Sequence, residues 1–135
     1  MSIRFVIPGP CPGKPRQTQS DKWRQRPCVM AYRRWADEAR RCAKGSIPRA
    51  ETVELLVVLA YYQPPASWSK KKKTKAMGRK KRSKPDGDNA LKACCDALWP
   101  DDDAALGDLF VQRFFGPRDE TVILIDCDEK PTTAR

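Results

Sequence analysis

Four stretches of the chain have the apolar pattern of β-strands. Residues 3–7, IRFVI, are β-branched and aromatic and predict a short strand. Residues 52–62, TVELLVVLAYY, form a longer apolar run that predicts a buried central strand. Residues 109–115, LFVQRFF, and 121–127, TVILIDC, predict two more strands, and the GPRDE between them is typical of a hairpin turn.

Two other segments repeat their apolar residues at helical spacing. In residues 29–43, VMAYRRWADEARRCA, apolar side chains fall on one face and arginines on the other. Residues 88–98, DNALKACCDAL, have the same spacing, and their polar residues recur at intervals of four on a second face. We interpret Cys94 and Cys95 as residues that pack this second helix against the core.

Between these segments, residues 63–85 are rich in lysine and proline and poor in apolar residues. This composition predicts a flexible basic loop at about residues 64–84, whose order depends on a bound partner. A chain of 135 residues suits one domain, 1–135. We therefore predict an α+β fold in the order β-α-β-(basic loop)-α-β-β, with a mixed sheet of about four strands and helices packed on it.

The net charge of +10 is divided unevenly along the chain. Residues 1–84 hold 22 Lys and Arg against 5 Asp and Glu, a charge of +17, whereas residues 85–135 hold 5 against 12, a charge of −7. Such asymmetry indicates an acidic site within a basic surface that attracts a polyanion. Nucleic acid is the favoured partner, ahead of a membrane surface.

The residue types that are missing narrow the chemistry. The chain has no histidine, which excludes a Ser-His-Asp triad, a Cys-His pair and a His-ligated metal centre. The six cysteines form no CxxC pair, and we expect reduced thiols. The first residues lack the apolar core of a signal peptide, and no apolar run approaches the ~20 residues that cross a bilayer. We expect a cytoplasmic protein without membrane contact.

Aspartates are the remaining candidates for chemistry. Asp86 and Asp88 flank Gly87 at the start of the second helix, Lys92 follows one turn later, and a run of three aspartates occupies 101–103. Mg²⁺ prefers oxygen ligands and commonly takes a few carboxylates together with water and phosphate oxygens. The helix between the two acidic groups spans ~16 Å, so the run must fold back to reach Asp86 and Asp88.

A purely structural interpretation competes with the metal site. Asp88 is then an N-cap, its pair with Lys92 a surface ion pair worth ~0.3–0.5 kcal/mol, and the run at 101–103 a solvated turn. Short acidic motifs often arise without function, so spacing alone leaves both interpretations open. Asp96, a single carboxylate on the helix surface, is interpreted as structural. A lysine run by itself does not specify DNA.

Three stretches resemble one known family. KPDGDNALKACCDAL, residues 84–98, resembles the signature KPDxDNxxKxxxDAL of the RusA-type Holliday-junction resolvases, in which a DD pair follows. IRFVIPGPCPGKPRQT, residues 3–18, is similar to that family's first strand and Pro/Gly/Lys loop, and FVQRFFGP, residues 110–117, to a later strand. The resemblance covers most of the chain, and the aspartate motif is its most specific part.

The resemblance implies the roles of individual residues. Asp86 and Asp88 would be metal ligands, Lys92 the essential lysine, and Asp103 the third acidic ligand. Because the connection to the DD pair is short and DDD offers two registers, Asp102 is the alternative. The family implies a homodimer that uses Mg²⁺, or Mn²⁺, to make paired nicks in four-way DNA junctions. The carboxylates and metal would activate water, and Lys92 would offset charge on the scissile phosphate.

The basic residues are the expected DNA contacts, because they can neutralise the phosphate backbone. Two alternatives to the junction resolvase stay open: a nuclease for other branched DNA, such as flaps or forks, and a non-catalytic basic DNA-binding protein. The expected contacts are Lys14, Arg16, Lys70, Lys71, Lys72, Lys73, Lys75, Arg79, Lys80, Lys81, Arg82 and Lys84.

Overall fold

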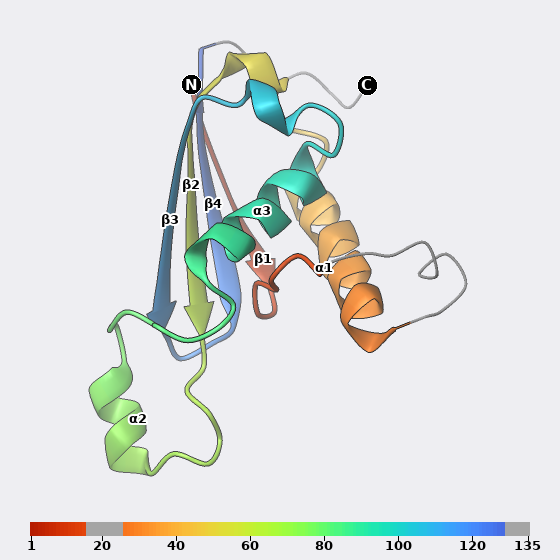
Figure 1. The fold of residues 1–135 in the computed structure, drawn as a ribbon. Helices are drawn as coiled ribbons and strands as arrows, with labels where there is room; N and C mark the ends of the chain where they lie inside the picture. Colours follow the sequence, from red (N-terminus) through yellow and green to blue (C-terminus); the bar gives the residue numbers. More distant parts are fainter. Residues whose placement is uncertain (16–25, 129–135) are drawn as a thin grey trace.

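The computed structural model describes residues 1–15 and 26–128 (Figure 1). Its mixed four-stranded sheet with packed helices confirms the predicted α+β class. None of the helices in the described ranges is both long and apolar enough to span a membrane. The elements are β1 (Ser2–Pro8), α1 (Pro27–Ala43), η2 (Ala50–Thr52), β2 (Val53–Tyr62), α2 (Lys70–Ala76), α3 (Gly87–Leu98), η3 (Asp103–Ala105), β3 (Asp108–Phe115) and β4 (Glu120–Cys127).

The strand order in the sheet is β1-β4-β2-β3, so the predicted hairpin between the last two strands is wrong. β4 pairs antiparallel with both β1 and β2, whereas β3 pairs parallel with the other edge of β2. β2 therefore separates the two strands that GPRDE connects. It is the longest strand and almost entirely apolar, which favours a position between two neighbours.

The connection from β3 to β4 passes over the end of β2. The Gly116 N–H donates to the Tyr62 carbonyl at 2.8 Å, and the Gln63 N–H donates to the Asp119 carboxylate at 2.7 Å. A Cβ at Gly116 would lie 3.2 Å from the ring of Tyr61, so this close crossing favours glycine. These contacts are long-range, and the local sequence does not distinguish this crossing from a hairpin.

Both long helices, α1 and α3, cover the same face of the sheet (Figure 1). Leu56, Val58, Ile123 and Ile125 fill the sheet side of the core. The helices are joined by polar contacts as well as by packing. Apart from Leu98, the buried side chains on α3 are small, which lets α1 approach closely. They include the two cysteines predicted to pack against the core, and they are Ala90, Ala93, Cys94, Cys95 and Ala97.

The basic segment contains the seven-residue helix α2, where the composition predicts only a loop. The ring of Trp68 lies against Phe115, with centroids 5.4 Å apart, and Lys72 lies 4.2 Å above the Trp68 centroid. Further along, Lys80 bridges antiparallel to Phe114 on the edge of β3. Contacts to β3 thus anchor the segment before α2 and the segment after it. The helix itself extends beyond the ends of β2 and β3 in Figure 1.

Candidate active site

The start of α3 presents two exposed carboxylates. Asp86 is the N-cap residue, and its Oδ1 accepts a hydrogen bond from the Asn89 N–H at 3.0 Å. Asp88 lies in the first helical turn, where a negative charge is favoured by the helix dipole. The helix cap is therefore Asp86, not Asp88. A carboxylate accepts at both oxygens, so capping through Oδ1 is compatible with a metal ion at Oδ2.

Two cations hold the segment that leads into this helix. The Arg113 guanidinium donates to the carbonyls of Ser83 and Pro85 at 2.8 and 2.9 Å. The buried Lys81 ammonium donates to the Ser83 hydroxyl at 2.9 Å and to the Lys84 carbonyl. Burial, with a smaller effect of Arg113, lowers the pKa of Lys81. Lys81 is among the expected DNA contacts, but its ammonium is directed at the main chain.

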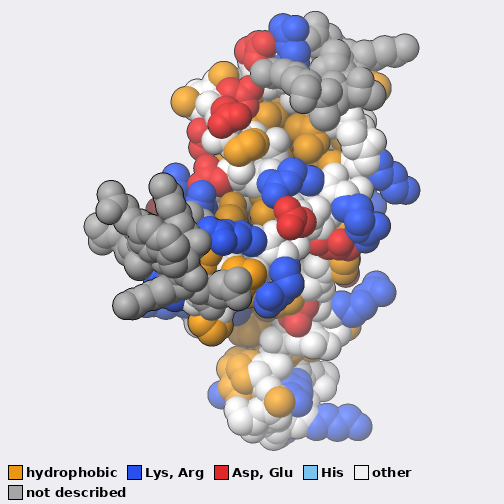
Figure 2. All heavy atoms as spheres, turned by 90° about the vertical axis from the view of Figure 1, so that its right-hand side faces the viewer, with side chains coloured by type: hydrophobic (Ala, Val, Ile, Leu, Met, Phe, Trp, Pro, Cys, Tyr) orange, Lys and Arg blue, Asp and Glu red, His pale blue; other side chains and the backbone are white. Residues whose placement is uncertain are grey.

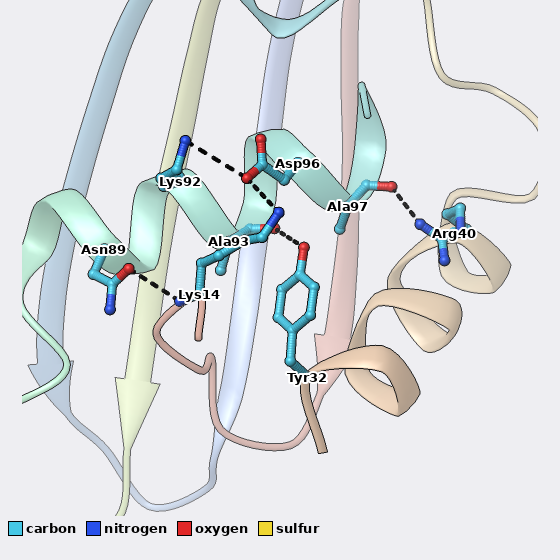
Figure 3. Close-up of polar contacts among 8 residues, drawn as sticks. All are labelled: Lys14, Tyr32, Arg40, Asn89, Lys92, Ala93, Asp96 and Ala97. Atoms are coloured by element: carbon cyan, nitrogen blue, oxygen red, sulfur yellow. Dashed lines mark hydrogen bonds and ion pairs between the residues drawn. The ribbon is translucent and has the colours of Figure 1, made fainter. Parts of the chain in front are cut away.

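Asp96 lies between two lysines on the exposed side of α3 (Figure 3). Its Oδ2 accepts from Lys14 Nζ at 2.8 Å and lies 3.7 Å from Lys92 Nζ. The Asp96 side chain is 13% exposed, against 28% for Lys14 and 62% for Lys92. Within the described residues the ion pair of Lys92 is thus with Asp96, rather than with Asp88 as the structural interpretation expects.

The loop after β1 runs along α3 and brings Lys14 to this position. The Lys14 N–H donates to Asn89 Oδ1 at 3.1 Å. A Cβ on Gly13 would lie 2.3 Å from Asn89 Nδ2, so a larger residue here would displace the Asn89 side chain that holds Lys14. One turn further, Cys11 Sγ lies 3.9 Å from Cys94 Sγ. The sequence pattern assigns no role to Asn89 and only a structural one to Asp96. The four-residue intervals between Asp88, Lys92 and Asp96 are the signal that could have pointed to Asp96.

The run at 101–103 lies at the other end of α3. Asp102 precedes η3 and Asp103 begins it, and Figure 1 shows η3 beyond the carboxyl end of α3. Burial raises the pKa of the Cys95 thiol to about 11, and the negative charges of Asp103 and Asp96 add to this effect. The charge of Asp103 therefore affects Cys95 in the second half of α3, whereas Asp86 lies at the start of the helix.

In residues 1–15 and 26–128, no three His, Cys, Asp or Glu side chains lie close enough to hold one metal ion. The structure brings together Asp86 and Asp88, because they share one helix start, but it does not bring Asp102 or Asp103 to them. The donor set at the helix start fits a hard cation that takes two carboxylates and fills its other positions with water and phosphate oxygens.

The expected DNA contacts come from several elements, including α2 and the loop after β1. Figure 2 shows Lys and Arg side chains over the helical face and on the part that carries α2. Lys14 is partly buried in its ion pair, and Arg16 lies outside the described residues. The remaining side chains are exposed or half-buried: Lys70, Lys71, Lys72, Lys73, Lys75, Arg79, Lys80, Arg82 and Lys84.

A carboxylate pair next to lysines on a basic surface suits hydrolysis of a phosphodiester, because the carboxylates hold a cation and the lysines attract the backbone. A search of curated proteins finds no match to the chain. The family model described as endodeoxyribonuclease RusA matches residues 8–126, which is most of the chain. The matched range includes all of α3, β2 and β3 and all of β4 except Cys127, but only the last residue of β1. The chain therefore belongs to the RusA family of endodeoxyribonucleases, the Holliday-junction resolvases.

Proposed function

We propose that this protein resolves four-way DNA junctions by metal-dependent paired nicks. The observation that carries the proposal is the exposed pair Asp86 and Asp88 at the start of α3, in a chain that belongs to a family of endodeoxyribonucleases. Arg113 and Lys81 hold the main chain just before this pair, which supports a site whose geometry is set before DNA arrives.

Asp86 and Asp88 are proposed to hold Mg²⁺, with Mn²⁺ as an alternative. Such an ion, when bound, supplies a Lewis acid that polarises the phosphate and makes water more acidic. The chain's own contribution is to place Lys92 one helical turn from Asp88, on the same side of α3. Lys92 is 62% exposed and 3.7 Å from Asp96, a weak contact that it can exchange for a phosphate oxygen.

Asp103 is proposed as the third acidic ligand, with Asp102 as the alternative. Because η3 and the start of α3 lie at opposite ends of that helix, one chain as it stands does not bring the three carboxylates together. Either the 101–103 run moves when metal and DNA bind, or the third carboxylate comes from a second copy of the chain.

A homodimer is part of the proposal. A four-way junction has two-fold symmetry, and an isologous dimer presents one acidic site to each of two opposed strands. The sheet face away from α1 and α3 exposes Leu55 and Phe110, 36% and 53% exposed, which supports association through an apolar surface. The proposed enzyme acts on cytoplasmic DNA.

The test compares labelled four-way junction, flap and linear duplex DNA, each with and without Mg²⁺. We expect symmetric nicks in the junction that require the metal, with the Asp86→Asn variant as the inactive control. Preferential cutting of flaps would favour the alternative of a nuclease for other branched DNA. Binding to all three substrates without cutting in either metal condition would favour the non-catalytic DNA-binding protein.

Wild-type protein mixed with the Asp103→Asn variant tests the dimer on a supercoiled cruciform. Purified heterodimers are expected to leave nicked circles, whereas wild-type dimers give linear product. Linear product from heterodimers at the wild-type rate would show that one subunit cuts both strands.

A further inference from the structure

Lys14 and Lys92 reach one carboxylate from different parts of the chain. Lys14 comes from the loop after β1 and contacts Asp96 at 2.8 Å, whereas Lys92 lies on α3 itself and contacts the same oxygen at 3.7 Å (Figure 3). Two ammonium groups thus compete for Oδ2 of Asp96, and Lys14 makes the shorter and more buried contact.

The main chain around Lys14 is held at several points. Asn89 accepts from the Lys14 N–H at 3.1 Å, and Gly13 lies directly against the Asn89 side chain. Before that, the Tyr62 hydroxyl donates to the Cys11 carbonyl at 2.8 Å. The backbone that carries Lys14 is therefore held close to α3, and the Lys14 ammonium is in turn held by its 2.8 Å contact with Asp96.

The surroundings of Asp96 make its charge matter. Its carboxylate is 13% exposed and lies next to the buried Tyr32. The pKa of the Tyr32 phenol is raised to about 12, first by the burial of Tyr32 and then by the negative charge of Asp96. A carboxylate this far from water attracts a cation more strongly than an exposed one. Among the described residues, Lys92 is the other cation in contact with Asp96 and would neutralise it if Lys14 were removed.

We propose that Lys14 is a positioning residue that neutralises Asp96 and so leaves Lys92 free to contact the scissile phosphate. With Lys14 in place, Asp96 carries a short ion pair already, and Lys92 leaves it at little cost when DNA arrives. When Lys14 is replaced, Asp96 holds Lys92 in a short ion pair and withdraws it from the substrate. This inference rests on the proposed nuclease function, in which Lys92 acts on the phosphate.

The experiment measures single-turnover cleavage of a four-way junction at saturating enzyme and metal, at a temperature where circular dichroism shows each variant folded. Lys14→Gln is expected to lower the rate by about tenfold, less than the ~100-fold that removal of a direct transition-state donor costs. Lys14→Arg keeps the charge and should keep the rate within about twofold. Lys44→Gln, an exposed lysine at the end of α1, is the matched control with an unchanged rate.

The decisive variant is the double substitution Lys14→Gln with Asp96→Asn. Because removing the Asp96 charge releases Lys92, the double variant should cut faster than Lys14→Gln alone. Two independent defects would instead make the double variant cut more slowly than either single variant. Asp96→Asn should not rescue Lys92→Gln, since no lysine is then left to release.

Three outcomes overturn the inference. The first is an unchanged rate in Lys14→Gln, and the second is a slower rate that Asp96→Asn does not relieve. The third is a defect that appears only when the enzyme concentration is below saturation, which would make Lys14 an ordinary phosphate contact. If wild-type protein cuts no junction under any metal condition, the proposed function itself fails, and this result is separate from the comparison of variants.

Discussion

The two acidic sites on α3 share a helix but differ in their surroundings. Asp86 and Asp88 are exposed at its start, where the Asp86 side chain caps the helix by accepting from the Asn89 N–H. Asp96, two turns beyond Asp88, is 13% exposed and lies against two lysines. Exposed carboxylates can take up a cation from solvent, whereas a carboxylate already neutralised by lysines has little to gain from one. The difference teaches that burial and ion pairing, more than residue type, distinguish a carboxylate proposed as a metal ligand from one that is already neutralised by lysines.

The largest expected effect is at the exposed pair. Asp86→Asn and Asp88→Asn should each reduce junction cleavage to background, because each removes a proposed metal ligand, while junction binding is kept or tightened as repulsion of phosphate falls. Asparagine caps a helix about as well as aspartate, so Asp86→Asn should melt within a few degrees of wild type. Normal nicking by both variants in Mg²⁺ would show that cleavage does not need Asp86 or Asp88 as a metal ligand.

The run at 101–103 extends the comparison to a third acidic group. Asp103→Asn is expected to abolish cleavage, whereas Asp102→Asn keeps most of it, as measured by single-turnover rates in Mg²⁺. The reverse result moves the proposed ligand by one residue.

A mixture of variants then locates this third ligand. If it comes from a second copy of the chain, Asp86→Asn mixed with Asp103→Asn regains nicking, because one complete site forms in each heterodimer. If one chain completes its own site by movement of the run, the mixture stays inactive.

An intermediate effect is expected on α2, whose lysines are mostly exposed to solvent, in contrast to Lys14, which pairs with the half-buried Asp96. Alanine at Lys70, Lys71, Lys72 and Lys73 should weaken junction binding and reduce the slope of log K against log salt. The expected reduction is ~0.9 for each phosphate that these lysines no longer neutralise. Binding titrations between low and moderate salt measure the slope. An unchanged slope would show that these lysines do not touch the DNA backbone.

The smallest expected effect concerns the thiol next to Asp103. The negative charge of Asp103 disfavours the Cys95 thiolate, so Asp103→Asn should lower the pKa of Cys95 from its raised value of about 11. Below that pKa a larger fraction is then thiolate, and alkylation at pH 9 should be about twofold faster. Exposed Cys28 is the internal control, read by mass spectrometry. Equal Cys95 rates would mean that Asp103 lies farther from the thiol than the structure places it.

The sequence by itself determined the elements with strong periodicity. The four strands and the two long helices lie where their apolar patterns placed them, within two residues at most ends, because side-chain burial on one face enforces those periods. It also placed Asp88, Lys92 and Asp96 on one side of α3, because residues four apart on a helix are neighbours whatever the rest of the chain does.

Tertiary structure alone decided the strand order, helix α2 and the setting of Asp96. β2 separates β3 from β4 because it pairs along both edges, and α2 is anchored through contacts of Trp68 and Lys80 with β3. Lys14 is 82 residues from Asp96 in sequence, so no local pattern predicts their ion pair. Contacts over such separations depend on how the layers pack, and they distinguish the half-buried, ion-paired Asp96 from the exposed pair on the same helix.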